Sequence, residues 1–294
     1  MAETRAAGTI YDLGYQTYQG ARLGRNHAIS NLIRYSFKTA FGIGRGTRAK
    51  LLPILVTAIV FLPAIVQVGV ASATNQPDFV NFAGFLQFTA FSIALFAAAQ
   101  APELIVTDKQ QGVLSLYLSR PITARDYALS KFFALTAAML VLTLGPQIFM
   151  FVGKVFLSAT PMDMLRREYP KLGPIIAGTT MTSLFVAAIS LAVSSFASRR
   201  AFATAGVIAV FMMLPAATEI VRSLTIGPVR KYARLGNPIV ILTGFTNWLF
   251  DVQSSRRSIV SRLDLPGQAY LYMMIAVILL GVGLLVMRYR RHNA

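Results

Sequence analysis

The chain of 294 residues contains no cysteine, only two histidines and only 11 acidic residues. The lack of cysteine excludes disulfides, thiolate metal sites and cysteine nucleophiles. His27 and His292 lie near the two chain ends, so they do not form a metal site or a catalytic dyad between apolar segments. A phosphate loop is also missing, because the glycines at 42–46 lack the lysine of that motif. We therefore expect no metal and no cofactor on this chain.

Charged residues are scarce as well. They make up 13% of the chain, against about 25% in soluble domains, whereas hydrophobic residues make up 55%. So little polar surface cannot cover a water-soluble globule, and the composition predicts a polytopic membrane protein. The net charge is +17. Because the basic residues flank apolar runs, we attribute them to membrane orientation and expect no nucleic-acid partner.

Six apolar segments have about the 20 residues needed to cross a bilayer as a helix. They occupy residues 51–73, 83–101, 128–156, 173–197, 201–221 and 269–287. The sequence therefore predicts an all-α polytopic membrane protein with a single six-span transmembrane domain at 51–288. Tails at 1–50 and 289–294 flank this domain.

Basic residues favour one orientation of these spans. They concentrate in the two tails, in the loop at 102–127 and at Arg199 and Arg200, whereas the short loop at 75–81 has none. The positive-inside rule then places both termini and the loop at 102–127 in the cytoplasm, with the protein in the cell inner (plasma) membrane. The long outer loop at 225–267 contains an apolar stretch too short to span, which predicts a re-entrant or interfacial helix.

The amino-terminal tail contains an amphipathic helix at about 28–42. Its apolar side and two basic residues one turn apart suit a helix lying on an anionic inner leaflet, with membrane lipid as a partner. The alternative is a helix packed on a soluble partner. The predicted membrane-interface residues are Ile29, Leu32, Ile33, Arg34, Phe37, Lys38 and Phe41.

Ionisable residues are missing from the middle of every predicted span. Ion-coupled carriers usually keep one there, because the coupling ion needs it. Glu219, near the end of a span, is expected to form a local ion pair with Arg222. Amides within the spans, at Gln67, Gln87 and Gln147, are expected to bond neighbouring helices. A weaker hypothesis is an apolar substrate path, whose candidate residues are Gln87, Phe88, Phe91 and Met212.

The loop between the second and third spans carries the most information. Residues 110–119 predict a short helix with a heavy apolar load, and Pro121 ends it. Thr123 can then cap the helix that leads into the third span. An apolar helix on the cytoplasmic face needs a groove to cover it, either on the membrane or on another protein.

This loop resembles the cytoplasmic loop of type-2 ATP-binding-cassette (ABC) exporter permeases. The matching residues are Asp108, Lys109, Gly112, Leu114, Leu118, Ser119, Pro121, Tyr127 and Lys131. The family often has Glu-Arg-Glu where this chain has Thr107, Asp108 and Lys109. The turn at 198–201 and the amphipathic helix also resemble features of that family.

The resemblance implies a permease subunit, in the exporter class, that forms a homodimer and binds two copies of a separate ABC ATPase. ATP and magnesium would lie on that partner, and residues 110–119 would be the coupling helix. The implied ATPase-coupling residues are Gly112, Leu114, Leu116, Leu118, Arg120, Pro121, Arg125, Arg199 and Arg200. An ion-coupled secondary carrier and a polytopic membrane enzyme or assembly factor are the alternatives. The scattered acids and the absence of histidine from the spans disfavour both.

Overall fold

The computed structural model describes residues 20, 23–113, 116–117, 122–227, 230, 232–252 and 265–290. In this part of the chain every regular element is a helix, and six helical stretches are long and apolar enough to cross a bilayer. The prediction of an all-α protein with six transmembrane helices is therefore confirmed.

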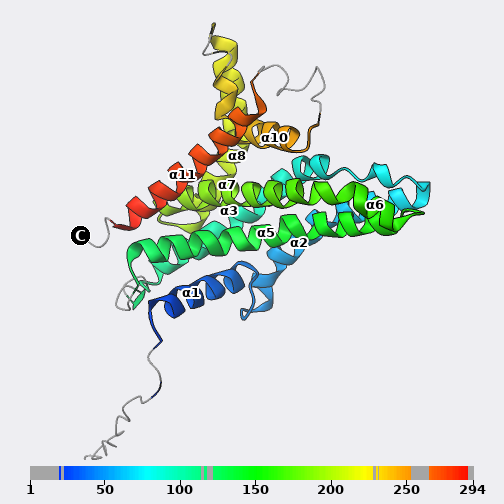
Figure 1. The fold of residues 1–294 in the computed structure, drawn as a ribbon. Coiled ribbons are helices and arrows are strands. Elements are labelled where there is room, and N and C mark those ends of the chain that lie inside the picture. Colours follow the sequence, from blue (N-terminus) through cyan, green and yellow to red (C-terminus); the bar gives the residue numbers. More distant parts are fainter. Residues whose placement is uncertain are drawn as a thin grey trace, which may run out of the picture.

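Figure 1 shows how the helices are arranged along the chain. They are α1 (Arg25–Ala40), α2 (Thr47–Thr74), η1 (Pro77–Phe79), α3 (Phe82–Gln110), α5 (Ala124–Phe156), α6 (Pro161–Glu168), η2 (Tyr169–Lys171), α7 (Leu172–Phe196), α8 (Arg200–Leu224), η3 (Ala233–Gly236), α10 (Pro238–Leu249) and α11 (Gly267–Arg290).

Helices α3, α5 and α7 form the centre of the bundle. More than half of the apolar part of each is buried, against about a fifth for α2, α8 and α11. Small residues let the helices approach closely. A Cβ on Gly281 of α11 would lie 2.9 Å from the carbonyl oxygen of Ala188 on α7. Between α5 and α7, the hydroxyls of Thr143 and Ser183 lie 3.2 Å apart.

The three amides singled out from the sequence all have partners. The Gln67 side chain accepts from the Asn81 N–H at 2.9 Å, and Gln147 donates to the Phe82 carbonyl at 3.0 Å. Gln87 donates to the Asn247 side chain of α10 at 2.7 Å. The expectation that these amides bond neighbouring segments is confirmed.

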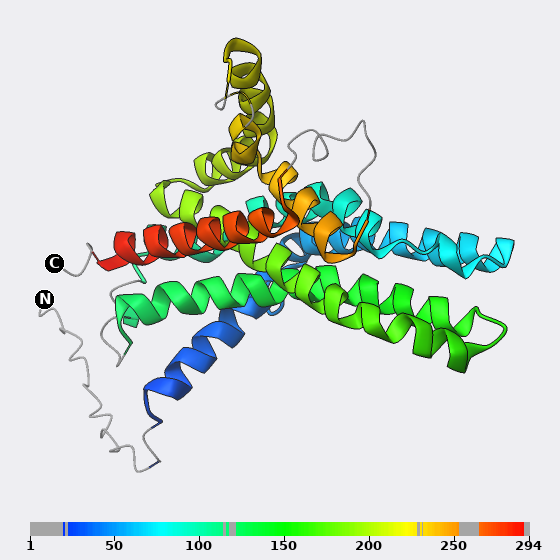
Figure 2. The ribbon, with the colours of Figure 1, turned by 45° about the horizontal axis from the view of Figure 1, so that its top comes forward.

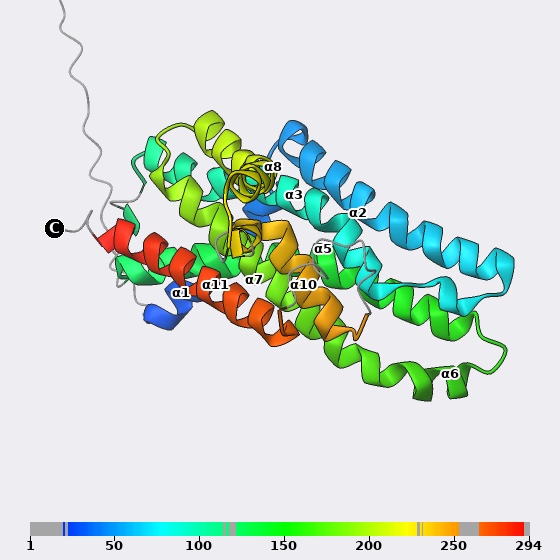
Figure 3. The same ribbon diagram turned by 90° about the horizontal axis from the view of Figure 1, so that it is seen from above.

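Helix α8 differs from the other long helices in direction. Its later part projects from the bundle in Figures 1 and 2, and Figure 3 shows it nearly end-on. Glu219 accepts from Arg222 at 2.6 Å, as predicted, and also from Arg234 of η3 at 2.8 Å. The predicted short apolar helix in the long loop is present as α10.

Two predicted loops are more helical than expected. Helix α3 continues through Pro102 and Glu103 to Gln110, so the second span does not give way to a loop at 102. The reason is that Glu103 is neutralised by two arginines from other segments and does not have to reach water. On the opposite side, α6 and η2 lead directly into α7 instead of forming an open outer loop.

A buried ion cluster fastens the end of the bundle that carries α6. Glu168 is 0% exposed, and its carboxylate lies 3.2 Å from Lys154 of α5 and 2.9 Å from Lys171 of η2. Lys154 also contacts the exposed Asp78 at 3.2 Å. A buried charge of this kind persists only where opposite charges surround it.

Replacing Glu168 with Gln should therefore lower the free energy of unfolding by about 3 kcal/mol, because Lys154 loses its buried counter-ion. Thermal unfolding of the purified protein in detergent measures this change. Asp163→Asn, an exposed change on the same helix, is the control and should cost less than about 1 kcal/mol. Equal melting temperatures for both variants would contradict this role for Glu168.

Candidate functional site

The candidate site lies at the end of the bundle where α3 ends, α5 begins and α11 ends. Thr123 caps α5, as predicted, and does so within a capping box. Its hydroxyl accepts from the Asp126 N–H at 3.3 Å, while the Asp126 carboxylate accepts from the Thr123 N–H at 2.9 Å. This arrangement satisfies N–H groups that a helix start leaves unpaired. It fixes where the chain re-enters the bundle after the loop.

Asp126 also ties α1 to α5. Arg25 donates to both oxygens of this carboxylate, from Nε at 3.0 Å and from Nη2 at 2.7 Å. Two parallel hydrogen bonds of this kind fix orientation as well as distance. The hydrogen bond and the charge of Asp126 raise the pKa of the Arg25 guanidinium above its ordinary value.

A buried charge pair joins α3 to α5 one turn further in. Lys131, 2% exposed, places Nζ 2.8 Å from the Asp108 carboxylate. The hydroxyl of Tyr127, which is fully buried, donates to the same carboxylate at 2.8 Å. Asp108, Tyr127 and Lys131, which stand apart in the sequence, are thus one contact set. We call these three residues the Asp108 cluster.

Aromatic rings extend the Asp108 cluster towards α11 and the loop. The ring of Tyr127 lies 5.1 Å from that of Tyr289 on α11 and 5.8 Å from that of Tyr117 in the loop. Lys131 lies over the rings of Tyr117 and Tyr127, and Lys109 lies over Tyr289. Lys109 also donates to the Ser195 carbonyl at the end of α7. The loop is therefore connected to four helices through one compact set of side chains.

A second charged group lies on the neighbouring side of α3. Arg45, between α1 and α2, donates to one oxygen of Glu103, and Arg200, at the start of α8, forms an ion pair with the other. Because Glu103 is buried, these partners compensate a charge that would otherwise be unfavourable. The contact joins the α1–α2 connection and the α7–α8 turn to α3.

The structure describes five of the nine predicted coupling residues. Gly112 has φ +67°, which favours glycine, and it follows the end of α3. Leu116 is 66% exposed despite being apolar. Arg125 and Arg199 are exposed, whereas Arg200 is engaged with Glu103. The other four, Leu114, Leu118, Arg120 and Pro121, lie outside the described residues.

The predicted membrane-interface helix packs chiefly on α5 of its own chain. Leu32 is buried, and the other apolar residues of the predicted face are half-buried, namely Ile29, Ile33, Phe37 and Phe41. Arg34 and Lys38 are exposed, as expected for the polar face. Thr39, next in the chain to Lys38, is nevertheless buried, because α1 contacts both α5 and α3 and is covered on more than one side.

The predicted substrate-path residues lie on α3 and α8. Gln87 is occupied by its hydrogen bond to Asn247. Phe88 is 73% exposed, and Phe91 and Met212 are about half exposed. Within one chain, the side chains of Phe88, Phe91 and Met212 therefore face outwards.

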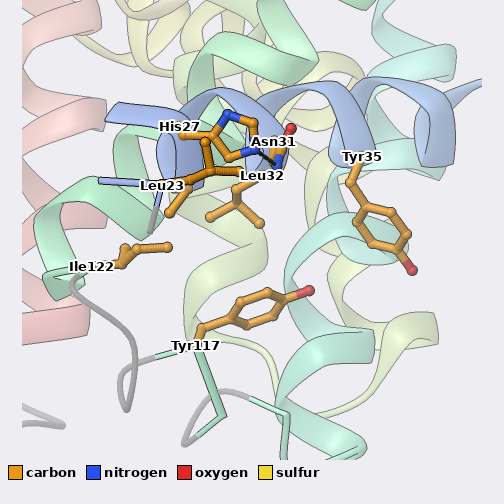
Figure 4. Close-up of a pocket in the computed structure, with 8 residues that line it drawn as sticks. Leu23, His27, Asn31, Leu32, Tyr35, Tyr117 and Ile122 are labelled. Carbon is orange, nitrogen blue, oxygen red and sulfur yellow. Dashed lines mark hydrogen bonds between the residues drawn. The ribbon is translucent and has the colours of Figure 1, made fainter. Parts of the chain in front are cut away.

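A cavity of about 450 Å³ separates α1 from the loop (Figure 4). Leu32 and Tyr35 of α1 lie on one side of it, and Tyr117 and Ile122 lie on the other. On α1, the side chains of Asn31 and His27 are hydrogen-bonded to each other at 2.7 Å. Tyr117, which lines the cavity, is next in the chain to the exposed Leu116.

A family model described as ABC-2 family transporter protein matches residues 7–292, which is nearly the whole chain. The chain belongs to this family. With its six apolar helices, it is a multi-pass membrane permease of the ABC-2 family, the membrane component of a transporter. A search of curated proteins found no match.

Sequence reasoning missed several residues of this ABC-2 permease. The sequence predicts that Glu103 lies in a loop, and it assigns no role to Arg45 or Tyr289. A signal existed for Glu103, because a lone acid directly after an apolar span calls for a nearby cation. No signal of that kind pointed to Tyr289, whose partners are distant in sequence.

Asp108→Asn should destabilise the ABC-2 permease by about 3–5 kcal/mol, because it leaves Lys131 buried without a counter-ion. The double variant Asp108→Asn/Lys131→Gln removes both charges and should recover much of that loss. Tyr127→Phe removes only one hydrogen bond and should cost about 1 kcal/mol. Thermal unfolding in detergent gives all three values. A double variant no more stable than Asp108→Asn would show that the two charges are not coupled.

Proposed function

We propose that this permease works as a homodimer with two copies of a separate ABC ATPase, and that it exports its substrate. ATP and magnesium would bind to the ATPase. The observation that carries the proposal is the exposed, apolar Leu116 on a loop anchored to the bundle by buried charges. An exposed leucine next to a cavity is suited to contact with another protein.

The Asp108 cluster supports a rigid link between the loop and the spans. A force on the loop would reach α3 through Asp108 and α5 through Lys131 and Tyr127, because these side chains are buried and in contact. Tyr289 would carry the same displacement to α11. Packed contacts of this kind transmit rigid-body shifts. ATP can bias the permease only if the docked ATPase differs in affinity for its two states.

The exposed residues on this junction fit an ATPase surface. Arg125 and Arg199 would pair with acidic residues of the partner, while Arg200 would act indirectly, by holding Glu103 and the α7–α8 turn. Leu114, Leu118, Arg120 and Pro121 remain part of the proposed contact on the basis of the sequence pattern alone.

Exposed apolar surface supports the homodimer. The later part of α8 projects from the bundle (Figure 2), and this helix carries exposed apolar side chains, among them Met212, Met213 and Leu224. A second copy would cover this helix and enclose the outward-facing Phe88 and Phe91. The substrate path would then lie between the two copies and not within one.

The proposed orientation can be tested with single cysteines, because the natural chain has none. A cysteine replacing the exposed Gln111 should be protected from an impermeant thiol reagent in intact cells and labelled after lysis. A cysteine replacing the exposed Thr160, beside α6, should be labelled in intact cells. The opposite pattern would invert the topology.

The proposed ATPase contact is tested by Leu116→Asp. A charge at this position should abolish copurification with the ATPase and substrate-stimulated ATP hydrolysis, because docking would bury an unpaired carboxylate. The fold should be retained, since the side chain is exposed in the permease alone. Leu116→Met should keep the contact.

Leu165→Asp places the same charge on the exposed face of α6, at the opposite end of the bundle, and serves as the control. It should copurify with the ATPase at the normal ratio. If Leu116→Asp also does so and transports normally, the loop is not the coupling element.

A further inference from the structure

A second cavity, of about 490 Å³, lies between α2, α3 and α8 at the α1 end of the bundle. Its charged lining consists of Arg45, Glu103 and Arg200, and its uncharged polar lining consists of Thr39, Gln100 and Thr204. The candidate substrate-path residues do not line this cavity, and of the predicted ATPase-coupling residues only Arg200, which has an indirect role there, lines it.

The cavity carries excess positive charge. Two guanidinium groups face one carboxylate, because Arg45 and Arg200 both form ion pairs with Glu103. A guanidinium has five N–H donors, so both arginines keep donors for another anion. Lys50 and Arg199, each next in the chain to a lining residue, are exposed and add to the positive potential.

The amide of Gln100 adds an uncharged donor to the lining. The residue is 6% exposed, lines the cavity, and makes no side-chain hydrogen bond within the described part of the chain. Its amide atoms are open to the cavity and are not among the sealed, unpartnered atoms of the bundle. An acceptor in the cavity can therefore bind to this amide directly.

The apolar side of the cavity continues along a surface suited to acyl chains. Leu52 lines the cavity and is partly exposed. It begins a stripe on α2 with spacings of three and four residues, whose other members are Leu55, Ile59, Leu62 and Val66, all exposed. At about 1.5 Å per residue the stripe is about 20 Å long, more than the hydrocarbon depth of one leaflet, about 15 Å.

We propose that this cavity binds the phosphate headgroup of an acidic phospholipid from the leaflet on the α1 side. Arg45, Arg200 and Gln100 donate to the phosphate oxygens, and the acyl chains lie along the α2 stripe. Basic pockets between transmembrane helices are suited to anionic headgroups. A bound lipid would hold α2, α3 and α8 together at one end. The proposal does not rest on the ATPase contact, because binding is measured on the permease alone.

The test titrates delipidated permease with phosphatidylglycerol or phosphatidylcholine and follows bound lipid by native mass spectrometry. Wild type should bind phosphatidylglycerol at least tenfold more tightly. Arg200→Gln should weaken that binding about tenfold, the size expected for one charge-assisted hydrogen bond. Gln100→Leu leaves the ion pairs intact and should weaken binding severalfold. Arg166→Gln, the same charge change on the exposed face of α6, should have no effect.

Equal affinity for the two lipids, or unchanged binding by both cavity variants, would overturn the proposal. Inorganic phosphate or glycerol phosphate binding as tightly as phosphatidylglycerol would assign the cavity to a soluble anion instead. A loss of dimer mass in Arg200→Gln with unchanged lipid affinity would assign it to a second copy. Gln100→Leu should melt at about the wild-type temperature without lipid, because it breaks no side-chain hydrogen bond of the described chain, so its binding defect would not reflect misfolding.

Discussion

Lys131 is the side chain on which the proposed coupling end of the bundle depends. An ammonium group that is 2% exposed in a membrane helix bundle persists only with a counter-charge at contact distance, and Asp108 supplies it at 2.8 Å. This requirement fixes the end of α3 against the start of α5. It thereby sets where the intervening loop leaves and re-enters the bundle. Three further contacts stabilise the same junction. Tyr127 donates to Asp108, Thr123 caps α5, and Arg25 of α1 binds Asp126.

Most of the fold could be predicted from the sequence, because membrane spans are recognisable by their length and hydropathy. The six segments, the cap at Thr123 and the Glu219–Arg222 pair follow from local rules and are present. The family motif named Asp108, Tyr127 and Lys131 together, but their contact depends on the packing of two helices. That step is not a local property of the sequence.

The predicted start of the loop near Glu103 is wrong because the prediction assumes that a charged side chain is exposed to water. Glu103 marked the start of a loop only under the assumption that a carboxylate must reach water. Arg45 and Arg200, 58 residues before it and 97 after it, remove that need. The burial of α1 likewise depends on segments distant in the sequence. Its amphipathic pattern predicts one apolar side, whereas two helices of the same chain cover it and bury Thr39 as well.

The distribution of burial separates the parts of the bundle that can move from those that cannot. Helices α3, α5 and α7 are mostly buried and are joined by hydroxyl and charge contacts, so a relative shift among them would disrupt close packing. Helices α2, α8 and α11 are mostly exposed, although α8 packs along α3 and α11 packs along α7. The outer helices have less buried surface to disrupt than the central ones, so a displacement of the loop that preserved the central three helices would be taken up by the outer ones.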